Sequence, residues 1–273
     1  MSDRMPYPHF PATLDARLML GRSGSAIFGR NVLAELVTGI EMALAEPTSK
    51  RRLGPVVLGC AAFMDDPALI DALGRVANAC IVITKQERRK HTTPSWQALQ
   101  QLSDSQGLLV SAYAELEELA PDDHGRPKLV GPETPRWHGE MQVGAVREMG
   151  YRKVGNQLVP WVHAKLALLG SLNWTDEHPS GHVVDEYFFT PHRLWIGSAN
   201  FTISSRRSLE VGLWTADESL LRAAKAFLLG LIELSEPLGK GPDALTPQFL
   251  PVEYDDAAIA AYLAEYVDDS DDH

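Results

Sequence analysis

The sequence predicts an α/β fold in which a mixed β-sheet is flanked by helices on both faces. Two apolar runs of strand length, at 55–63 and 80–84, enclose a helical pattern at 65–79. A strand, a helix and a second strand with short connections form a βαβ unit, whose parallel strands are covered on both faces. Further strands are expected at 107–114, 142–150, 161–169, 192–200 and 209–215.

Helices are expected where apolar residues recur at helical spacing after a capping residue. Asn31 precedes such a stripe, and Asp66 followed by Pro67 is a typical helix start. A short helix is expected at 95–102, a longer one from Asp217 to Leu234, and a last one at about 256–267.

One domain over residues 1–273 is the simplest organisation, because no repeat and no strong linker is visible. Its core is expected at about 55–232, between an irregular N-terminal extension and an acidic C-terminal tail. The Pro- and Gly-rich segment 121–137 is expected to be a surface loop.

The composition favours a soluble globular protein. The chain is 45% hydrophobic and 22% charged, and it has no run near the roughly 20 apolar residues that a membrane helix needs. The start lacks the apolar core of a secretory signal, so we expect a cytoplasmic protein without stable membrane association. Cys60 and Cys80 lie in apolar runs and are expected to be buried hydrophobes, not a disulfide or a zinc site.

The charge pattern leaves the partner open. A net charge of −11 argues against a surface that grips nucleic acid non-specifically, although the ending YVDDSDDH contributes part of it. Basic clusters at 50–52 and 88–90 can line a groove or be plain solvated faces.

His163 and Lys165 are the first candidates for chemistry. Two residues apart in a predicted strand, they point to the same side. Histidine supplies a nucleophile or general acid near neutral pH, and lysine supplies a cation for phosphate oxygens. By itself this pair is a weak signal.

The segment WIGSANFT adds small polar groups. Gly197 allows a close backbone approach, and Ser198 and Asn200 offer a hydroxyl and an amide at a strand end. Glu210 is a lone carboxylate in an apolar strand, where either a salt bridge or the orientation of an imidazole explains it. Arg206 and Arg207 could add phosphate contacts or face solvent.

Together, His163-Ala-Lys165, Gly197-Ser198-Ala-Asn200 and Glu210 resemble the signature of the phospholipase D superfamily. The phrase AAFMDDPALIDAL at 61–73 resembles that family's first βαβ unit, so the resemblance covers about 55–232. It implies a phospholipase D-like fold and a phosphodiesterase without metal or other cofactor, in which His163 forms a phosphohistidine. It also implies that Lys165, Ser198 and Asn200 hold the phosphate while Glu210 orients the imidazole.

The sequence departs from the family pattern after the lysine. The usual aspartate five residues on is Gly170 here, and the gap to the second motif is widened by a predicted loop at 170–192. Substitutes for the missing carboxylate are Asp176, Asp185 and Glu186, although each also fits a solvated loop charge. The phrase GSLNWT at 170–175 mimics the second motif and is interpreted as a turn.

The number of His-x-Lys pairs in the chain predicts its oligomeric state. The resemblance implies two histidines, one that attacks phosphorus and one that protonates the leaving oxygen, yet none of the other eight histidines has a lysine two residues on. Short single-copy members of the family dimerise, so we expect a homodimer with one composite site.

Three functions remain open from the sequence. The leading one is an endonuclease that cuts DNA or RNA. A further alternative within this function is the cutting module of a bacterial defence or repair system with partner proteins. The second is a phospholipase D-type lipid phosphodiesterase or phosphatidyl transferase. The third is a catalytically impaired domain that binds phosphate groups or mediates assembly, which Gly170 would permit.

Overall fold

The fold is described from a computed structural model. It describes residues 16–20, 24–85, 93–117, 119–121, 129–131, 142–150, 153–154, 157–158, 162–177, 183–239, 249–251 and 253–268. The predicted loop at 121–137 lies mostly outside these residues, as do the basic cluster at 88–90 and the last residues of the acidic tail.

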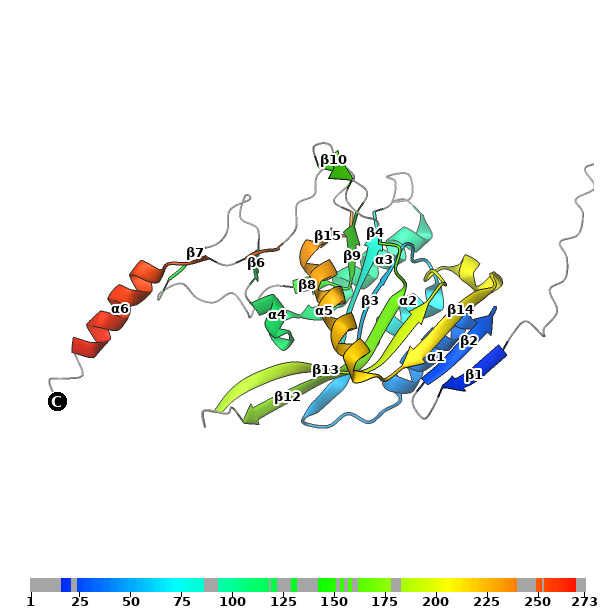
Figure 1. The fold of residues 1–273 in the computed structure, drawn as a ribbon, viewed down its shortest axis with the longest axis horizontal. Coiled ribbons are helices and arrows are strands. Elements are labelled where there is room, and N and C mark those ends of the chain that lie inside the picture. The colour runs from blue at the N-terminus through cyan, green and yellow to red at the C-terminus, as the bar shows by residue number, and fades with distance from the viewer. Residues whose placement is uncertain are drawn as a thin grey trace, which may run out of the picture.

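A nine-stranded mixed sheet forms the centre of the fold, in the order β1-β2-β14-β13-β12-β3-β4-β9-β15 (Figure 1). β3 pairs in parallel with β4, and β4 with β9, whereas the other neighbours are antiparallel. The predicted α/β class with a mixed sheet is therefore confirmed. The strands are β1 Ala16–Leu20, β2 Gly24–Gly29, β3 Arg52–Ala61, β4 Asn78–Thr84, β9 Val146–Met149, β12 Leu166–Glu177, β13 Val183–Gly197, β14 Glu210–Thr215 and β15 Glu236–Pro237.

Helices cover both faces of this sheet. On one face lie α1 Val32–Leu44, α2 Pro67–Leu73 and α3 Pro94–Ser105, and on the other α4 Ala114–Glu117 and α5 Glu218–Leu234. Alternate residues of β3 belong to two separate cores, since Val57 packs with the first set and Leu58 with the second. In Figure 1, α5 crosses in front of the strands and α1 and α2 lie behind them.

The βαβ unit forms as predicted, with a shorter helix. The Asp66 carboxylate caps α2 by accepting a hydrogen bond from the Leu69 amide at 3.0 Å. α2 ends at Leu73 and β4 begins at Asn78, so the helical pattern expected at 65–79 is too long. Asn31 precedes α1 without a side-chain capping bond, whereas Asp217 caps α5 as expected.

Two predictions of irregular structure are wrong. The N-terminal extension contributes the hairpin β1–β2, in which β1 is the edge strand of the sheet and β2 pairs with β14. The segment 170–192 is largely strand, because β12 and β13 continue as an antiparallel pair from Gly170↔Pro191 to Glu177↔Val183. Leu172 and Phe189, which are opposite each other in this pair, are buried on the α5 face and hold the ribbon in register.

The remaining elements are short. The strand expected at 107–114 is only β5 Gly107–Leu109, followed by the 3₁₀ turn η3 Val110–Ala112, and 142–150 splits into β8 Gln142–Gly144 and β9. A second 3₁₀ turn is η4 Ile203–Arg207, and the last helix is α6 Asp256–Asp268. Two-residue and three-residue strands complete the list: β6 Leu119–Pro121, β7 Leu129–Val130, β10 Lys153–Val154, β11 Gln157–Leu158, β16 Phe249–Pro251 and β17 Glu253–Tyr254.

None of the helices in the described part of the chain is long and apolar enough to cross a membrane.

Candidate active site

His163 and Lys165 meet just before β12 begins, not within a strand. The Lys165 ammonium donates a 2.7 Å hydrogen bond to the His163 carbonyl oxygen and lies 3.2 Å from Nε2 of the His163 ring. Lys165 is 7% exposed, whereas His163 is exposed. The pair predicted to share one side is thus in direct contact, with the imidazole open to a ligand.

The buried position of Lys165 affects its charge. Removal from water lowers the pKa of the ammonium below its ordinary value, while the nearby Glu210 carboxylate raises that pKa. A desolvated cation of this kind attracts an anion more strongly than a solvated one does. Phosphate oxygens are therefore a chemically fitting ligand for this end of the sheet.

Ser198 and Glu210 lie next to Lys165, at the end of β13 and the start of β14. The Ser198 hydroxyl donates to Glu210 Oε2 at 2.5 Å and accepts from the Val211 amide at 2.9 Å. The Gly197 amide donates to the Lys165 carbonyl oxygen at 3.0 Å, and this bond holds the end of β13 next to the lysine. Glu210 thus holds Ser198, and the orientation of the imidazole by Glu210 stays a prediction.

Close packing explains why position 197 is a glycine, which the sequence did not reveal. A Cβ at this position would lie 3.1 Å from the Val211 carbonyl oxygen and 3.2 Å from Nε1 of Trp195. The close approach that the structure shows here is between neighbouring strands.

Asn200 follows Ser198 by two residues, and its side chain has an acceptor oxygen without a described hydrogen-bond partner. Its Oδ1 is buried and has no hydrogen-bond partner among the described residues, which is uncommon for a buried amide. The backbone around it is fixed, because the Phe201 amide donates to the Phe63 carbonyl oxygen at 3.1 Å and the Asp65 amide donates to the Phe201 carbonyl oxygen at 3.0 Å.

A pocket of about 420 Å³ opens next to Asn200. Its walls come from the β3–α2 connection, the start of α3 and the segment after β13, and they include the half-exposed ring of Phe63 and the indole of Trp96. This pocket offers apolar surface within reach of the polar groups above.

Arg206 has a structural partner. Its Nη2 donates to Asp66 Oδ1 at 2.9 Å, and its Nε donates to Asp66 Oδ2 at 2.5 Å. Burial alone would raise the pKa of the Asp66 carboxyl, but the hydrogen bonds from Arg206 and the Leu69 amide bring it below its ordinary value. Arg206 therefore connects η4 to the start of α2, and the phosphate contact suggested for it is not needed to explain its position. Arg207 is exposed.

None of the three carboxylates considered as substitutes for the one missing at Gly170 lies at the His163 end of β12. A side chain at Gly170 would overlap the Thr190 carbonyl oxygen and the Phe189 ring, because a β-bulge lies at this point. Asp176, Asp185 and Glu186 belong to the outer part of the β12–β13 ribbon, at the end of β12 away from His163. Asp185 accepts a bond from the Trp174 indole at 3.2 Å.

The two cysteines are buried and unpaired, as predicted for small hydrophobes. Burial raises the pKa of Cys60 and of Cys80 to about 12, so neither thiol is a ready nucleophile. The described residues include no cluster of three or more His, Cys, Asp or Glu side chains that could hold a metal ion.

No family model and no curated protein matches the sequence. The chain is similar to the solved structure of NucT from Helicobacter pylori, with 14% identity, a TM-score of 0.45 and coverage of 79% of this chain and 98% of NucT. It is similar to Nuc from Salmonella typhimurium, a phospholipase D family member, with 13% identity, a TM-score of 0.41 and coverage of 78% and 97%. Polyphosphate kinase from Porphyromonas gingivalis matches with 15% identity, a TM-score of 0.45 and coverage of 80% of this chain and 27% of the kinase. Nuc belongs to the family that the sequence resembles.

Proposed function

We propose that this protein is a phosphodiesterase, and specifically a metal-independent endonuclease that cuts DNA or RNA through a phosphohistidine on His163. The observation that carries the proposal is the contact between the exposed His163 ring and the buried Lys165 ammonium, at 3.2 Å. A nucleophile next to a desolvated cation suits attack on a negatively charged phosphodiester.

Each remaining side chain has a role in this proposal. In this proposal the Ser198 hydroxyl, which donates to Glu210 in this structure, donates instead to a phosphate oxygen. The side-chain amide nitrogen of Asn200 supplies a further donor. Glu210 keeps Lys165 cationic, because its negative charge raises the pKa of the ammonium.

In the proposed reaction, a His163 ring nitrogen attacks phosphorus as the bond from phosphorus to the leaving oxygen breaks. A second imidazole protonates that oxygen, and water then cleaves the phosphorus–nitrogen bond and restores His163. Because the chain has one His-x-Lys pair, the second imidazole comes from His163 of another copy in a homodimer. Location in the cytoplasm and work with partner proteins of a defence or repair system belong to the same proposal.

The decisive experiment measures cleavage of fluorescent single-stranded and double-stranded DNA and RNA in EDTA. His163→Ala is expected to lower the rate by about a thousandfold or more, as for the loss of a covalent nucleophile. Retained cleavage in the variant would contradict the role of His163. If neither protein cuts, phospholipid turnover and phosphate binding become the next assays, for the lipid enzyme and the impaired domain.

The dimer is tested by sedimentation of the full chain. We expect a species of about twice the chain mass of 30.0 kDa. Cleavage by a protein that is strictly monomeric would contradict the proposed composite site.

A further inference from the structure

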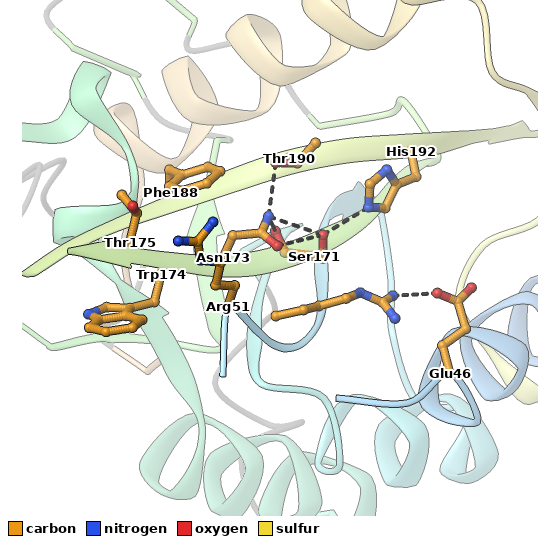
Figure 2. A pocket seen from close by; sticks show the side chains of 10 residues that line it. Glu46, Arg51, Ser171, Asn173, Trp174, Thr175, Phe188, Thr190 and His192 are labelled. Carbon is orange, nitrogen blue, oxygen red and sulfur yellow. Dashed lines mark hydrogen bonds and ion pairs between the residues drawn. The ribbon is translucent and has the colours of Figure 1, made fainter. Parts of the chain in front are cut away.

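A second pocket, of about 590 Å³, lies at the other end of the β12–β13 pair from His163. Its floor is the part of the ribbon that pairs with the start of β3, where Ser171 is opposite Pro55 and Asn173 is opposite Arg52. Figure 2 shows the side chains that line it, which include Arg51, Asn173, Trp174, Phe188, Thr190 and His192. The proposed reaction uses none of them.

A chain of hydrogen bonds runs along the floor of this pocket (Figure 2). The Asn173 amide nitrogen donates to Thr190 Oγ1 at 2.9 Å and to Ser171 Oγ at 3.2 Å. Ser171 Oγ is in turn 2.8 Å from Nε2 of His192. Since Ser171 is only 2% exposed, these polar groups are held in place before any ligand arrives.

Charged side chains line the pocket. Two arginines face one carboxylate there, and Arg52 forms an ion pair with that carboxylate, Glu46. The surrounding protein as a whole has a net charge of −11. Burial lowers the pKa of His192, and the positive charge of Arg52 lowers it further, in spite of Glu46. Arginine side chains next to fixed polar groups form a site that suits a phosphate group.

Aromatic side chains line the same pocket. Phe188 is 42% exposed, an unusual position for such a ring in a strand. The Trp174 indole is held by its hydrogen bond to Asp185, at 3.2 Å. Accessible aromatic rings beside arginines form a surface on which nucleobases stack.

We propose that this pocket binds one nucleotide unit, with the phosphate near Arg51 and His192 and the base against Trp174 or Phe188. The unit is either a free nucleotide or one residue of a nucleic-acid strand. In the second case the pocket extends the substrate site of the proposed nuclease, and that part of the inference rests on the proposed function. The binding itself is independent of chemistry at His163.

The experiment uses the full chain with His163→Ala as background, so that no probe is cleaved. Binding of adenosine 5′-monophosphate and of inorganic phosphate is measured by calorimetry, and binding of a fluorescent 12-nucleotide single strand by anisotropy. Arg51→Glu is expected to weaken the binding of the nucleotide by about tenfold or more, through the loss of a phosphate contact. The matched control is Arg222→Glu, an exposed position on α5, and it is expected to stay within about twofold.

A second variant separates base recognition from phosphate recognition. Trp174→Ala is expected to weaken nucleotide binding by about tenfold, the size of one stacking contact, and to leave inorganic phosphate binding unchanged. Phe188→Ala repeats the test with the other ring, and circular dichroism confirms that each variant is folded. Equal effects of Arg51→Glu and Arg222→Glu, or no loss from either aromatic variant, would overturn the proposal, as would the absence of binding by every probe.

The probes also identify the source of the nucleotide. Similar affinity for the monophosphate and the 12-mer indicates a free nucleotide, whereas much tighter binding of the 12-mer that Arg51→Glu weakens indicates a strand. Cleavage of bis(p-nitrophenyl) phosphate by Arg51→Glu with an intact His163 tests the proposed function separately. Nucleotide binding without such cleavage contradicts the phosphodiesterase, and cleavage without nucleotide binding contradicts only the pocket.

Discussion

The two ends of the β12–β13 pair carry the same residue types in different surroundings. One end has Gly197-Ser198-Ala-Asn200 close to His163, and the other has Gly170-Ser171-Leu-Asn173 close to His192. At the first end, Ser198 is exposed and bonded to Glu210. At the second end, Ser171 is 2% exposed and bonded to His192.

The difference between the ends lies in the cation. Lys165 is buried against the His163 ring, whereas Arg52 at the ribbon end is paired with Glu46. A desolvated cation in contact with an open imidazole is suited to phosphoryl chemistry, and arginines beside a hydrogen-bonded imidazole are suited to binding. A short motif therefore indicates chemistry only together with its neighbours.

The largest expected effect separates the two ends directly. Lys165→Met is expected to lower cleavage of bis(p-nitrophenyl) phosphate by about a thousandfold, or about 4 kcal/mol, because it removes the charge that stabilises the transition state. The corresponding change at the ribbon end, His192→Gln, is expected to leave this rate within about twofold. A comparable loss in His192→Gln would show that the ribbon end takes part in the reaction.

Gly170→Asp tests whether the missing carboxylate can be restored. We expect the free energy of unfolding to fall by about 3 kcal/mol without any gain in cleavage, since the new Cβ overlaps the Thr190 carbonyl oxygen and the Phe189 ring. Urea denaturation gives the stability. Gly230→Asp on α5, where an added Cβ meets nothing within 4 Å, is the matched control. Higher activity in Gly170→Asp would mean that the position is a degenerate site residue.

Asp66→Asn tests the anchor of the segment that carries Asn200. We expect a loss of about 2 kcal/mol at neutral pH, from the charge-assisted bonds to Arg206. The folded-state pKa of Asp66 is below its ordinary 3.8, so this contribution is present above 3.8 and is lost as the pH falls through the folded value. Urea midpoints at neutral and acid pH measure it, and the variant should converge on the wild type in acid.

The smallest effect concerns the pH dependence of cleavage. Glu210→Gln keeps an acceptor for Ser198 but removes the negative charge that raises the pKa of Lys165. The alkaline limb of the pH–rate profile should therefore move to lower pH, because Lys165 loses its proton earlier. An unmoved limb, with the rate lowered at every pH, would assign Glu210 a purely structural role.

Much of the fold was predictable from local pattern. The α/β class, the βαβ unit with the Asp66 cap and Pro67, and the helix after Asp217 depend on residues close in sequence. The β1–β2 hairpin and the outer ribbon were missed because their order depends on pairing with β14 and on contacts to the α5 face.

The sequence by itself determined which groups are available: a His-x-Lys pair, two Gly-Ser-x-Asn segments and a carboxylate at 210. Only the tertiary structure decided which of them meet, because backbone pairing places Gly197 against Lys165 and puts Ser171 with His192 at the far end of the same two strands. Burial and charge contacts act through space between segments distant in the chain. The pKa of Lys165, the pairing of Arg206 with Asp66 and the arginine-lined pocket on the ribbon therefore depend on the fold.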